Sequence, residues 1–378
     1  MGLLRSARTM RRDLIAVGLA LALAQTTAGE ESKDPDRGVI TPTAIAGETW
    51  KGPQFVQADP QGRAYVLRLS SFEVYPFLRV QGKLGQPDPL ETLPDDGVAA
   101  APVMGVAMSS SGEWITLQPP NRLRYFDARG QEQQLPLPAW AVESVGWWDD
   151  RPVVGVLPYE LGGSLDGGSS ETDAWDVPPV LLAYSPRRSA WEAVYSLPLE
   201  HKSPRGQRPW RSTLLAPGGK GDLWVVWDYR YQVAHINRGG KVLERFAVGG
   251  AEIDYRDRSV AHVAALKAQG RDPKTLPPQV ANKKVRAAAA RDGRLYLLTT
   301  AGDGNRPFTL DRYTPLEETL ERVELTLSPY RGRQTLAAAK DGLILTRYRG
   351  TQGRFLISWE ALDAAAWQPV DSIEPIDP

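Results

Sequence analysis

The side chains best suited to chemistry in this sequence are arginines and aromatic residues that occur together in three segments. These segments span residues 201–211, 228–231 and 330–333. Arginine presents a planar set of hydrogen-bond donors to carboxylates and phosphates, and it also stacks on aromatic rings. The pattern indicates a binding surface for an anionic or sugar-like ligand. The candidate ligand-binding residues are Trp210, Arg211, Asp228, Tyr229, Arg230, Arg331 and Arg333.

The same arginines have an alternative, purely structural explanation. Glu160, Glu252, Asp254 and Asp257 occur in segments expected near the arginines, where they could form ion pairs with them. Exposed ion pairs of this kind contribute little free energy and need no ligand. Residue type alone therefore leaves both interpretations open.

Catalytic and metal-binding signatures are missing from the sequence. It contains no Cys and only three His, which excludes thiol catalysis, disulfides and Cys-bound metals and disfavours a His-rich site. His235 alternates with apolar neighbours and is expected to be a buried or half-buried structural residue. There is no serine-nucleophile elbow, Walker A loop or His-Glu-x-x-His motif. No cofactor is predicted: residues 162–173 contain Asp166 and Asp173 and could bind Ca²⁺, but their Gly- and Ser-rich composition is more typical of a flexible loop.

The composition points to a large folded domain made of short strands. Lys plus Arg and Asp plus Glu both number 45, so the chain has no net charge, which disfavours a nucleic-acid-binding protein. The hydrophobic fraction of 42% is sufficient for a large core. With 35 Gly and 31 Pro, the chain is expected to contain many turns.

Copies of one pattern recur along the chain. Each begins with a short strand of small or apolar residues, continues through a turn that holds Gly and ends in a β-branched or aromatic strand; the five clear copies are residues 55–69, 103–117, 214–227, 285–299 and 335–346. Third and fourth strands follow at residues 122–137, 232–248 and 309–325, and residues 142–158 with 180–197 form a degenerate further copy. Six copies of four antiparallel strands predict an all-β, six-bladed β-propeller, with five or seven blades as open alternatives.

Strand composition agrees with a propeller. The first strands are rich in small residues, as in residues 287–290 and 337–339, where neighbouring blades would converge around a central channel. The second strands carry large aromatic residues such as Trp114, Trp224 and Tyr296, which would fill the space between blades.

The order of strands and turns resembles the six-bladed propellers of the NHL-repeat and TolB-like kind. Their recurrent Asp-x-x-Gly or Asp-Gly turns appear here at Asp59–Gly62, Asp292–Gly293 and Asp341–Gly342, and the resemblance covers about residues 50–370. It implies an architecture and not a chemistry. Six-bladed relatives include metal-dependent lactonases, which implies an alternative function as a metal-dependent hydrolase or lactonase. Their Glu, Asn and Asp ligands have no clear counterparts among the four Asn of this sequence.

The long insertions are all expected at one end of the propeller. They fall in second-to-third strand loops and in links between blades, for example at residues 158–177, 198–211 and 249–284. Loops on a rigid scaffold commonly carry function. The last of these insertions predicts a helix that starts near Asp257 or Ser259 and ends at Gly270, with Val260, Val263 and Leu266 on one stripe. This helix is expected to be either a partial lid or a plain surface helix.

Residues 1–28 have the features of a signal peptide. Four arginines precede an apolar run at residues 14–24, which is too short to span a bilayer as a helix. An uncleaved anchor and a twin-arginine signal remain alternatives. The chain is therefore expected to be exported to the periplasm or exterior of a bacterium. After the signal peptide, residues 29–49 are expected to be a flexible leader with a candidate ring-closing strand, residues 50–370 the propeller and residues 371–378 a C-terminal tail.

These features favour a binding or scaffold protein over an enzyme. The ligand or partner would be held on the loop-rich face around the central channel. A protein, a peptide, a glycan or an anionic small molecule fits this surface, whereas nucleic acid does not. We further expect a monomer with no transmembrane span once the signal peptide is removed.

Overall fold

The secondary structure consists mainly of short antiparallel strands. The computed structural model describes residues 39–44, 54–58, 64–68, 73–76, 78–80, 83–85, 91–92, 105–118, 122–129, 131–133, 135–138, 140–160, 179–196, 213–249, 255–257, 260–268, 270, 272, 274, 279–281, 283–300, 308–327, 334–347 and 353–376. The expected signal peptide lies outside the described residues. None of the described helices is long and apolar enough to cross a membrane.

Five complete blades are described, each named here by its first strand. The β9 blade contains β9 (Gly105–Met108), β10 (Trp114–Gln118), β11 (Arg122–Phe126) and β12 (Glu132–Gln133). The β13 blade contains β13 (Trp140–Trp148), β14 (Arg151–Glu160), β15 (Pro179–Ser185) and β16 (Ala190–Ser196). The β17 blade contains β17 (Thr213–Pro217), β18 (Leu223–Trp227), β19 (Gln232–Ile236) and β20 (Val242–Val248). The β23 blade contains β23 (Val285–Arg291), β24 (Arg294–Thr300), β25 (Phe308–Thr314) and β26 (Thr319–Leu325). The β27 blade contains β27 (Gln334–Ala339), β28 (Gly342–Arg347) and β29 (Arg354–Ser358), with β2 (Thr43–Ala44) as its outer strand.

The structure thus shows five complete blades and not the six that the repeats predict. A further sheet, the β3 sheet, contains β3 (Gln54–Ala58), β4 (Ala64–Arg68), β5 (Glu73–Pro76) and β8 (Glu91–Thr92). Between its third and fourth strands the chain forms a separate hairpin of β6 (Leu78–Val80) and β7 (Lys83–Gly85). The outer strand β8 follows this hairpin, and both of its residues pair with β5.

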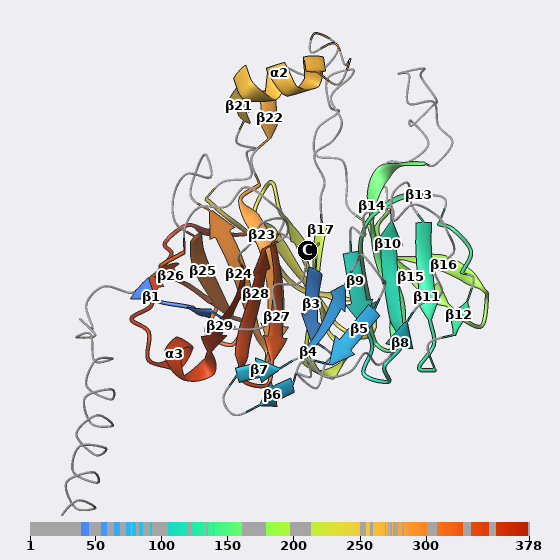
Figure 1. Ribbon diagram of the computed structural model, residues 1–378, viewed down its shortest axis with the longest axis horizontal. Helices are drawn as coiled ribbons and strands as arrows, with labels where there is room; N and C mark the ends of the chain where they lie inside the picture. Colours follow the sequence, from blue (N-terminus) through green and yellow to red (C-terminus); the bar gives the residue numbers. More distant parts are fainter. Residues whose placement is uncertain are drawn as a thin grey trace, which may run out of the picture. The chain divides into compact units, whose positions relative to one another are not determined.

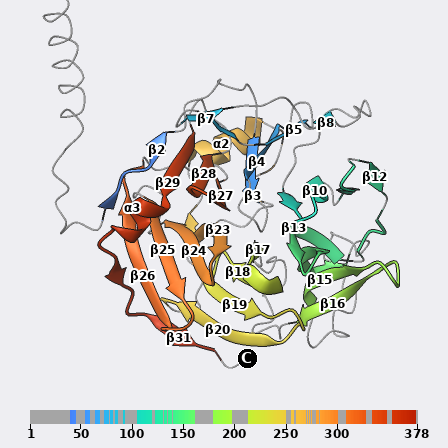
Figure 2. The same ribbon diagram turned by 90° about the horizontal axis from the view of Figure 1, so that it is seen from below.

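The sheets are arranged in a closed circle. The first strands β3, β9, β13, β17, β23 and β27 contact one another in that order, and β27 also contacts β3. Figure 2 shows the blades around this circle, with their outer strands on the rim. This arrangement confirms the expected all-β propeller architecture.

The core fills the spaces between neighbouring blades. Trp224 and Val226 of the β17 blade belong to the same buried cluster as Leu295 and Leu297 of the β23 blade. On β23, Ala287 and Ala289 are buried in the cluster that joins this blade to the β27 blade. Since the first strands of adjacent blades contact one another here, small side chains are needed, as the sequence predicts.

The tight turns follow the backbone rules that make them recognisable in the sequence. Asp292 and Gly293 both have positive φ, at 51° and 78°, and link the paired residues Arg291 and Arg294. At the next Asp-Gly pair the turn is shifted by one residue, because Gly342 already pairs with Ala339. Gly342 has φ of 155°, and a Cβ there would lie 2.1 Å from the carbonyl oxygen of Ile357, so this position requires glycine.

Both ends of the described chain add strands to the outside of the circle. β1 (Val39–Ile40) pairs in parallel with β26, and β2 pairs with β29. After α3 (Trp359–Asp363), β30 (Gln368–Pro369) pairs with β26, and β31 (Ile373–Pro375) pairs with β20. Residues 371–378, expected as a tail, therefore contain a strand of the β17 blade's sheet.

The link between the β17 and β23 blades contains the predicted helix. It holds a hairpin of β21 (Tyr255–Asp257) and β22 (Gln279–Ala281) with α2 (Val260–Ala268) between the two strands, and the group projects from one end of the circle (Figure 1). Gly270, with φ of 69°, follows the helix. Leu266 is buried, but Val260 is 87% exposed, so the predicted apolar stripe is only partly buried.

Candidate functional site

The connection between β18 and β19 is a tight turn at residues 228–231, which we call the DYRY turn after its sequence. It is a second-to-third strand connection and lies at the end of the circle where such connections meet. Tyr231 has φ of 50°, a left-handed conformation that is unfavourable for a bulky aromatic residue. Such strain costs about 1–3 kcal/mol and persists only where surrounding contacts impose it.

Contacts with the β23 blade impose the conformation of Tyr231. Its hydroxyl donates a 2.5 Å hydrogen bond to Oδ2 of Asp311, which is fully buried on β25. Nε and Nη2 of Arg322 donate to the two oxygens of the same carboxylate, each at 2.7 Å. Burial and the charge of Asp311 raise the pKa of Tyr231 well above its usual value, so the phenol stays protonated. Within its own blade, the amide of Val248 at the end of β20 donates to the carbonyl oxygen of Tyr231 at 3.0 Å.

Contacts with the start of β23 hold the other end of the turn. Asp228 is fully buried, and its carboxylate accepts a hydrogen bond from Nζ of Lys283. The carbonyl oxygen of Asp228 accepts hydrogen bonds from the amides of Lys284 and Val285, at 2.8 and 2.9 Å. A buried carboxylate with a hydrogen-bonded cation fixes geometry strongly, because separating the two charges would be costly. Both ends of the DYRY turn are therefore fixed to the β23 blade.

Tyr229 is the half-buried residue that the turn presents. Nζ of Lys283 lies 5.0 Å from the centre of its ring, within range of a cation–π interaction. Burial raises the pKa of the Tyr229 phenol, with further contributions from Asp228 and Glu143, while Arg286 opposes this shift. The phenol therefore remains a neutral donor and acceptor among charges of both signs.

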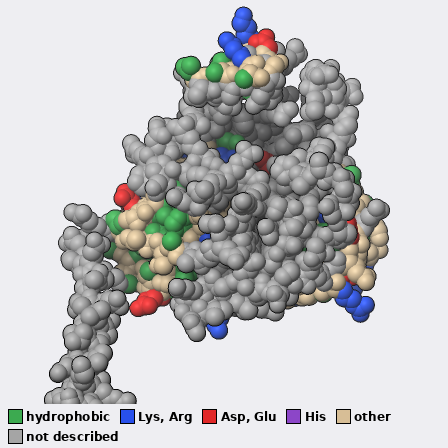
Figure 3. All heavy atoms as spheres, viewed as in Figure 1, with side chains coloured by type: hydrophobic (Ala, Val, Ile, Leu, Met, Phe, Trp, Pro, Cys, Tyr) green, Lys and Arg blue, Asp and Glu red, His purple; other side chains and the backbone are tan. Residues whose placement is uncertain are grey.

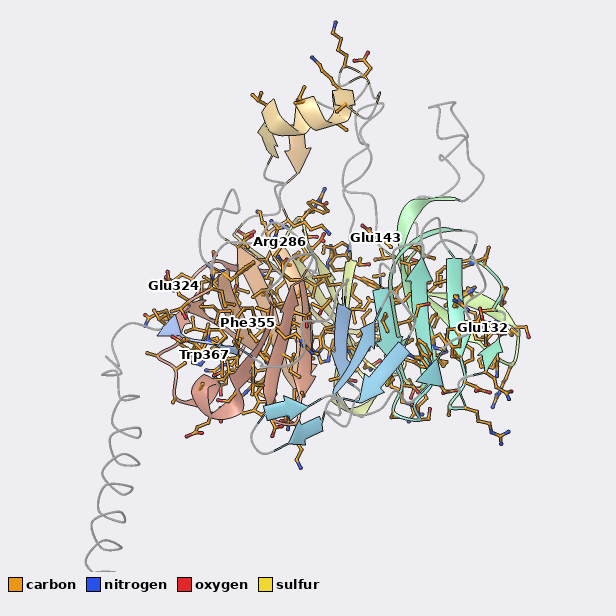
Figure 4. All side chains as sticks on the ribbon, viewed as in Figure 1. Glu132, Glu143, Arg286, Glu324, Phe355 and Trp367 are labelled. Atoms are coloured by element: carbon orange, nitrogen blue, oxygen red, sulfur yellow. The ribbon has the colours of Figure 1, made fainter. Side chains whose placement is uncertain are left out.

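Two of these charged residues come from first strands that line the circle. Glu143 is on β13 and Arg286 is on β23, and both lie at the end of the circle from which α2 projects (Figure 4). Nε of Arg286 donates to Oγ1 of Thr300 at 3.4 Å. We refer to Tyr229, Arg230, Lys283, Arg286 and Glu143 as the mouth residues.

Three of the seven candidate ligand-binding residues can be placed. Asp228 is buried and holds the turn, whereas Tyr229 and Arg230 are half-buried. The other four lie outside the described residues: Trp210, Arg211, Arg331 and Arg333. Sequence reasoning missed Lys283, Arg286 and Glu143. Their positions in the sequence could have identified them, because each lies in or just before a first strand, near the end of that strand that faces the mouth.

Polar residues at the opposite end of the circle join one blade to the next. Oγ of Ser110 donates to Asp150 at 3.1 Å, Arg238 pairs with Asp149 at 2.7 Å, and the hydroxyl of Tyr313 donates to Glu244 at 2.6 Å. These side chains come from short hairpins and neighbouring strands. Their contacts are structural, which leaves the elaborated end as the better candidate for binding.

His235 is buried, as the sequence predicts. Its ring stacks on Trp224 with 3.9 Å between ring centres. Nδ1 lies 3.1 Å from Glu244, and Nε2 lies 3.4 Å from Asp222.

No cluster of three or more His, Cys, Asp or Glu that could bind a metal occurs within the part of the chain that the structure describes. The stretch at residues 162–173, considered for Ca²⁺, lies outside that part.

The surface of the α2 region combines apolar and charged side chains. Val260 and Lys267 of the helix are exposed, and so are Asp272 and Lys274 beyond it. Figure 3 shows hydrophobic side chains of this region beside basic and acidic ones. The helix has the exposed surface that either a lid or a plain surface helix would have.

No family model matches the chain, and no curated protein matches it. Several solved structures are similar. A streptogramin B lyase is 12% identical with a TM-score of 0.42, over 80% of this chain and 93% of that chain. A catalytically inactive virginiamycin B lyase from Staphylococcus aureus with quinupristin is 13% identical with a TM-score of 0.42, over 81% and 94% of the two chains. The β-propeller domain of Myceliophteria thermophila Cps50 (Swd1) is 11% identical with a TM-score of 0.44, over 84% and 100%. At such identities the likeness concerns the fold alone, and by its own sheets and their order this chain is a β-propeller.

Proposed function

We propose that this chain is an exported β-propeller that binds a ligand or partner at the mouth residues and does not catalyse a reaction. The observation that carries the proposal is the DYRY turn. The backbone of Tyr231 is in an unfavourable conformation. Two fully buried carboxylates hold the turn, Asp228 at its start and Asp311 through Tyr231 at its end. Left-handed residues also occur in plain hairpin turns, as at Ser189 and Glu318. Such turns do not need two fully buried carboxylates to hold them, and this combination is typical of positions where the backbone must present particular side chains.

The chemistry of the mouth residues suits a polar ligand. Tyr229 offers an aromatic face and a neutral hydroxyl, while Arg230 and Arg286 offer planar donors for oxygen atoms. Glu143 adds an acceptor. A peptide, a glycan or an anionic small molecule could use these groups together. We propose that Trp210, Arg211, Arg331 and Arg333 complete the surface, on the basis of their positions in connections that belong to the same end of the circle.

We also propose that the chain is a propeller of the NHL-repeat or TolB-like kind, in which the β3 sheet closes the circle of the five complete blades. Support comes from β3, which contacts both β27 and β9 and so fills the position between the last and first complete blades. The Asp59–Gly62 turn expected between its first two strands is the sequence feature shared with that kind of propeller.

Export is the remaining part of the proposal. It is supported by the arginine-rich start and the short apolar run of residues 14–24. Expression of the full chain in a bacterium, followed by fractionation and sequencing of the N-terminus, tests it. Cleavage near residue 28 and recovery from the periplasm or medium are expected, whereas an intact N-terminus in the cytoplasm would contradict export.

Binding can be tested by thermal-shift measurements against a panel of peptides, oligosaccharides and organic acids. A binder should raise the melting temperature of the natural chain, and Tyr229→Ala or Arg230→Ala should remove most of that rise. Arg238→Ala is the matched control, because Arg238 is 74% exposed and pairs with Asp149 at the opposite end. The proposed site would be refuted by a ligand that still raises the melting temperature of Tyr229→Ala and Arg230→Ala but no longer raises that of Arg238→Ala.

The same preparation tests the alternative of a metal-dependent hydrolase or lactonase. Elemental analysis of the purified protein should find no stoichiometric divalent metal if the chain only binds its ligand. One metal ion per chain, together with lactone hydrolysis that a chelator abolishes, would replace the binding proposal with the enzymatic one.

A further inference from the structure

The C-terminal segment of the chain wraps the outside of the circle. We call residues 364–376 the C-terminal strap. It leaves α3 at the β27 blade, adds β30 to the edge of the β23 blade and then adds β31 to the edge of the β17 blade. Figure 2 shows β31 along the outer side of β20, and Figure 4 places Trp367 near α3. The strap therefore connects three consecutive blades.

One route leads from the strap to the DYRY turn through the end of β20. The amide of Gly249 donates to the carbonyl oxygen of Ser372 at 3.0 Å, and Val248 pairs with Ile373. The amide of the same Val248 donates to the carbonyl oxygen of Tyr231. Val248 is thus bound by the strap on one side and binds the strained residue of the turn on the other.

A second route runs through β26. Gln368 of the strap is the register partner of Arg322, and the amide of Val370 donates to the carbonyl oxygen of Leu320 at 2.8 Å. Arg322 holds both oxygens of Asp311, which accepts the hydrogen bond from the Tyr231 hydroxyl. The strap therefore pairs with the strand segment that carries Arg322, and the guanidinium of Arg322 binds Asp311, the residue that holds Tyr231 in place.

Apolar packing joins the two routes. Tyr231, Val248, Phe246 and Leu320 belong to one buried cluster, and Val370 and Ile373 of the strap pack against it from outside. The strap therefore covers the cluster in which the aromatic ring of Tyr231 is buried.

We propose that the C-terminal strap is a positioning device for the DYRY turn, so that loosening the strap releases the turn while the blades stay folded. Two hydrogen-bonded routes and one apolar cluster end at Tyr231, whose unfavourable backbone conformation would relax once those contacts weaken. The inference concerns the conformation of the turn and does not depend on what the mouth residues bind.

The test is hydrogen exchange of individual amides in the full chain and in two variants. One variant lacks residues 371–378, and the other is Glu374→Pro, which places a residue without an amide proton in β31 opposite Ala247. The informative amides are Val248, Lys284 and Val285, because each donates to a carbonyl oxygen of the turn. The matched control is Thr43→Pro in β2, which pairs with β29 on another blade.

We expect exchange at these three amides to rise at least tenfold in both strap variants, with amides of β28 unchanged. In Thr43→Pro the rise should be confined to the β27 blade. Unchanged exchange at the turn would overturn the proposal, and so would an equal rise in every blade. If neither strap variant folds, the strap supports the whole circle and not the turn, which also overturns it.

Discussion

The hydroxyl of Tyr231 donates a hydrogen bond to the buried carboxylate of Asp311 across the boundary between the β17 and β23 blades. The two residues are 80 positions apart, and Arg322 completes the group from the neighbouring strand. The same contact thus joins two blades and fixes the backbone of the turn that presents Tyr229 and Arg230. Stability and the geometry of the candidate site share one polar network here.

Removing parts of this network should produce graded losses of stability. Tyr231→Phe removes one hydrogen bond and leaves Asp311 with Arg322, so we expect the free energy of unfolding to fall by about 1–3 kcal/mol. Asp311→Ala removes the acceptor of both partners and should cost about 3–5 kcal/mol. Urea denaturation at neutral pH measures both. Equal losses in the two variants would show that Arg322 contributes nothing to the network.

The buried tyrosines should make the protein less stable at alkaline pH. Burial and nearby carboxylates raise the pKa of Tyr229, Tyr231 and Tyr313 above the value of about 10 that they have in the unfolded chain. The stabilisation is fully present below pH 10 and is lost as pH rises further, because the unfolded chain then ionises first. Each such tyrosine should contribute a slope of about 1.4 kcal/mol per pH unit there.

Denaturation curves between pH 8 and about pH 11, with absorbance near 295 nm to follow phenolate formation, measure this effect. In Tyr231→Phe, the fall of the free energy of unfolding with pH should be less steep by the contribution of one tyrosine, about 1.4 kcal/mol per pH unit. Phenolate absorbance that appears in full near pH 10 while the protein is still folded would contradict the assignment of these residues as protected.

Features of the fold that depend on neighbouring residues could be predicted from the sequence. The Asp292–Gly293 turn was recognisable because both of its positions need positive φ, and the helix at α2 because its start and end signals are local. The run of small residues on β23 follows from the convergence of first strands. The repeat pattern presents the β3 sheet as a regular blade because nothing local marks the β6–β7 hairpin between its third and fourth strands.

Contacts between distant segments could not be predicted in this way. Asp311 and Arg322 are register partners on β25 and β26, and correct strand register would have suggested their ion pair. Their use of Tyr231 depends on the packing of two blades, which no periodicity reveals. The pairing of β31 with β20 was missed for the same reason, since an exposed edge strand accepts many sequences.

The Lys283–Asp228 pair should be essential for the stability of the site. Lys283→Ala leaves the fully buried carboxylate of Asp228 without its ammonium partner, and we expect a loss of about 3–5 kcal/mol. Adding Asp228→Asn to that variant should recover part of the loss, because an amide carries no charge. The control Arg238→Ala removes a pair with a largely exposed guanidinium and should cost at most about 1 kcal/mol. Similar losses in Lys283→Ala and the control would contradict the importance of burial.

Gly155 tests the packing between the β13 and β17 blades. A Cβ at this position would lie 2.1 Å from Oγ1 of Thr213 and 2.3 Å from Oγ of Ser144, two hydroxyls that are hydrogen-bonded to each other at 2.9 Å. Gly155→Ala should therefore lower the free energy of unfolding by about 1–3 kcal/mol.

Gly219→Ala is the matched control for this substitution, since nothing lies within 4 Å of a Cβ built at Gly219. Removal of both hydroxyls by Ser144→Ala and Thr213→Ala in the Gly155→Ala background should restore much of the loss, because the clashing atoms are then gone. Thermal unfolding of the four chains, natural, Gly155→Ala, Gly219→Ala and the triple variant, measures the series. If the triple variant is no more stable than Gly155→Ala, the cost arises from the backbone of β14 and not from the hydroxyl pair at the blade boundary.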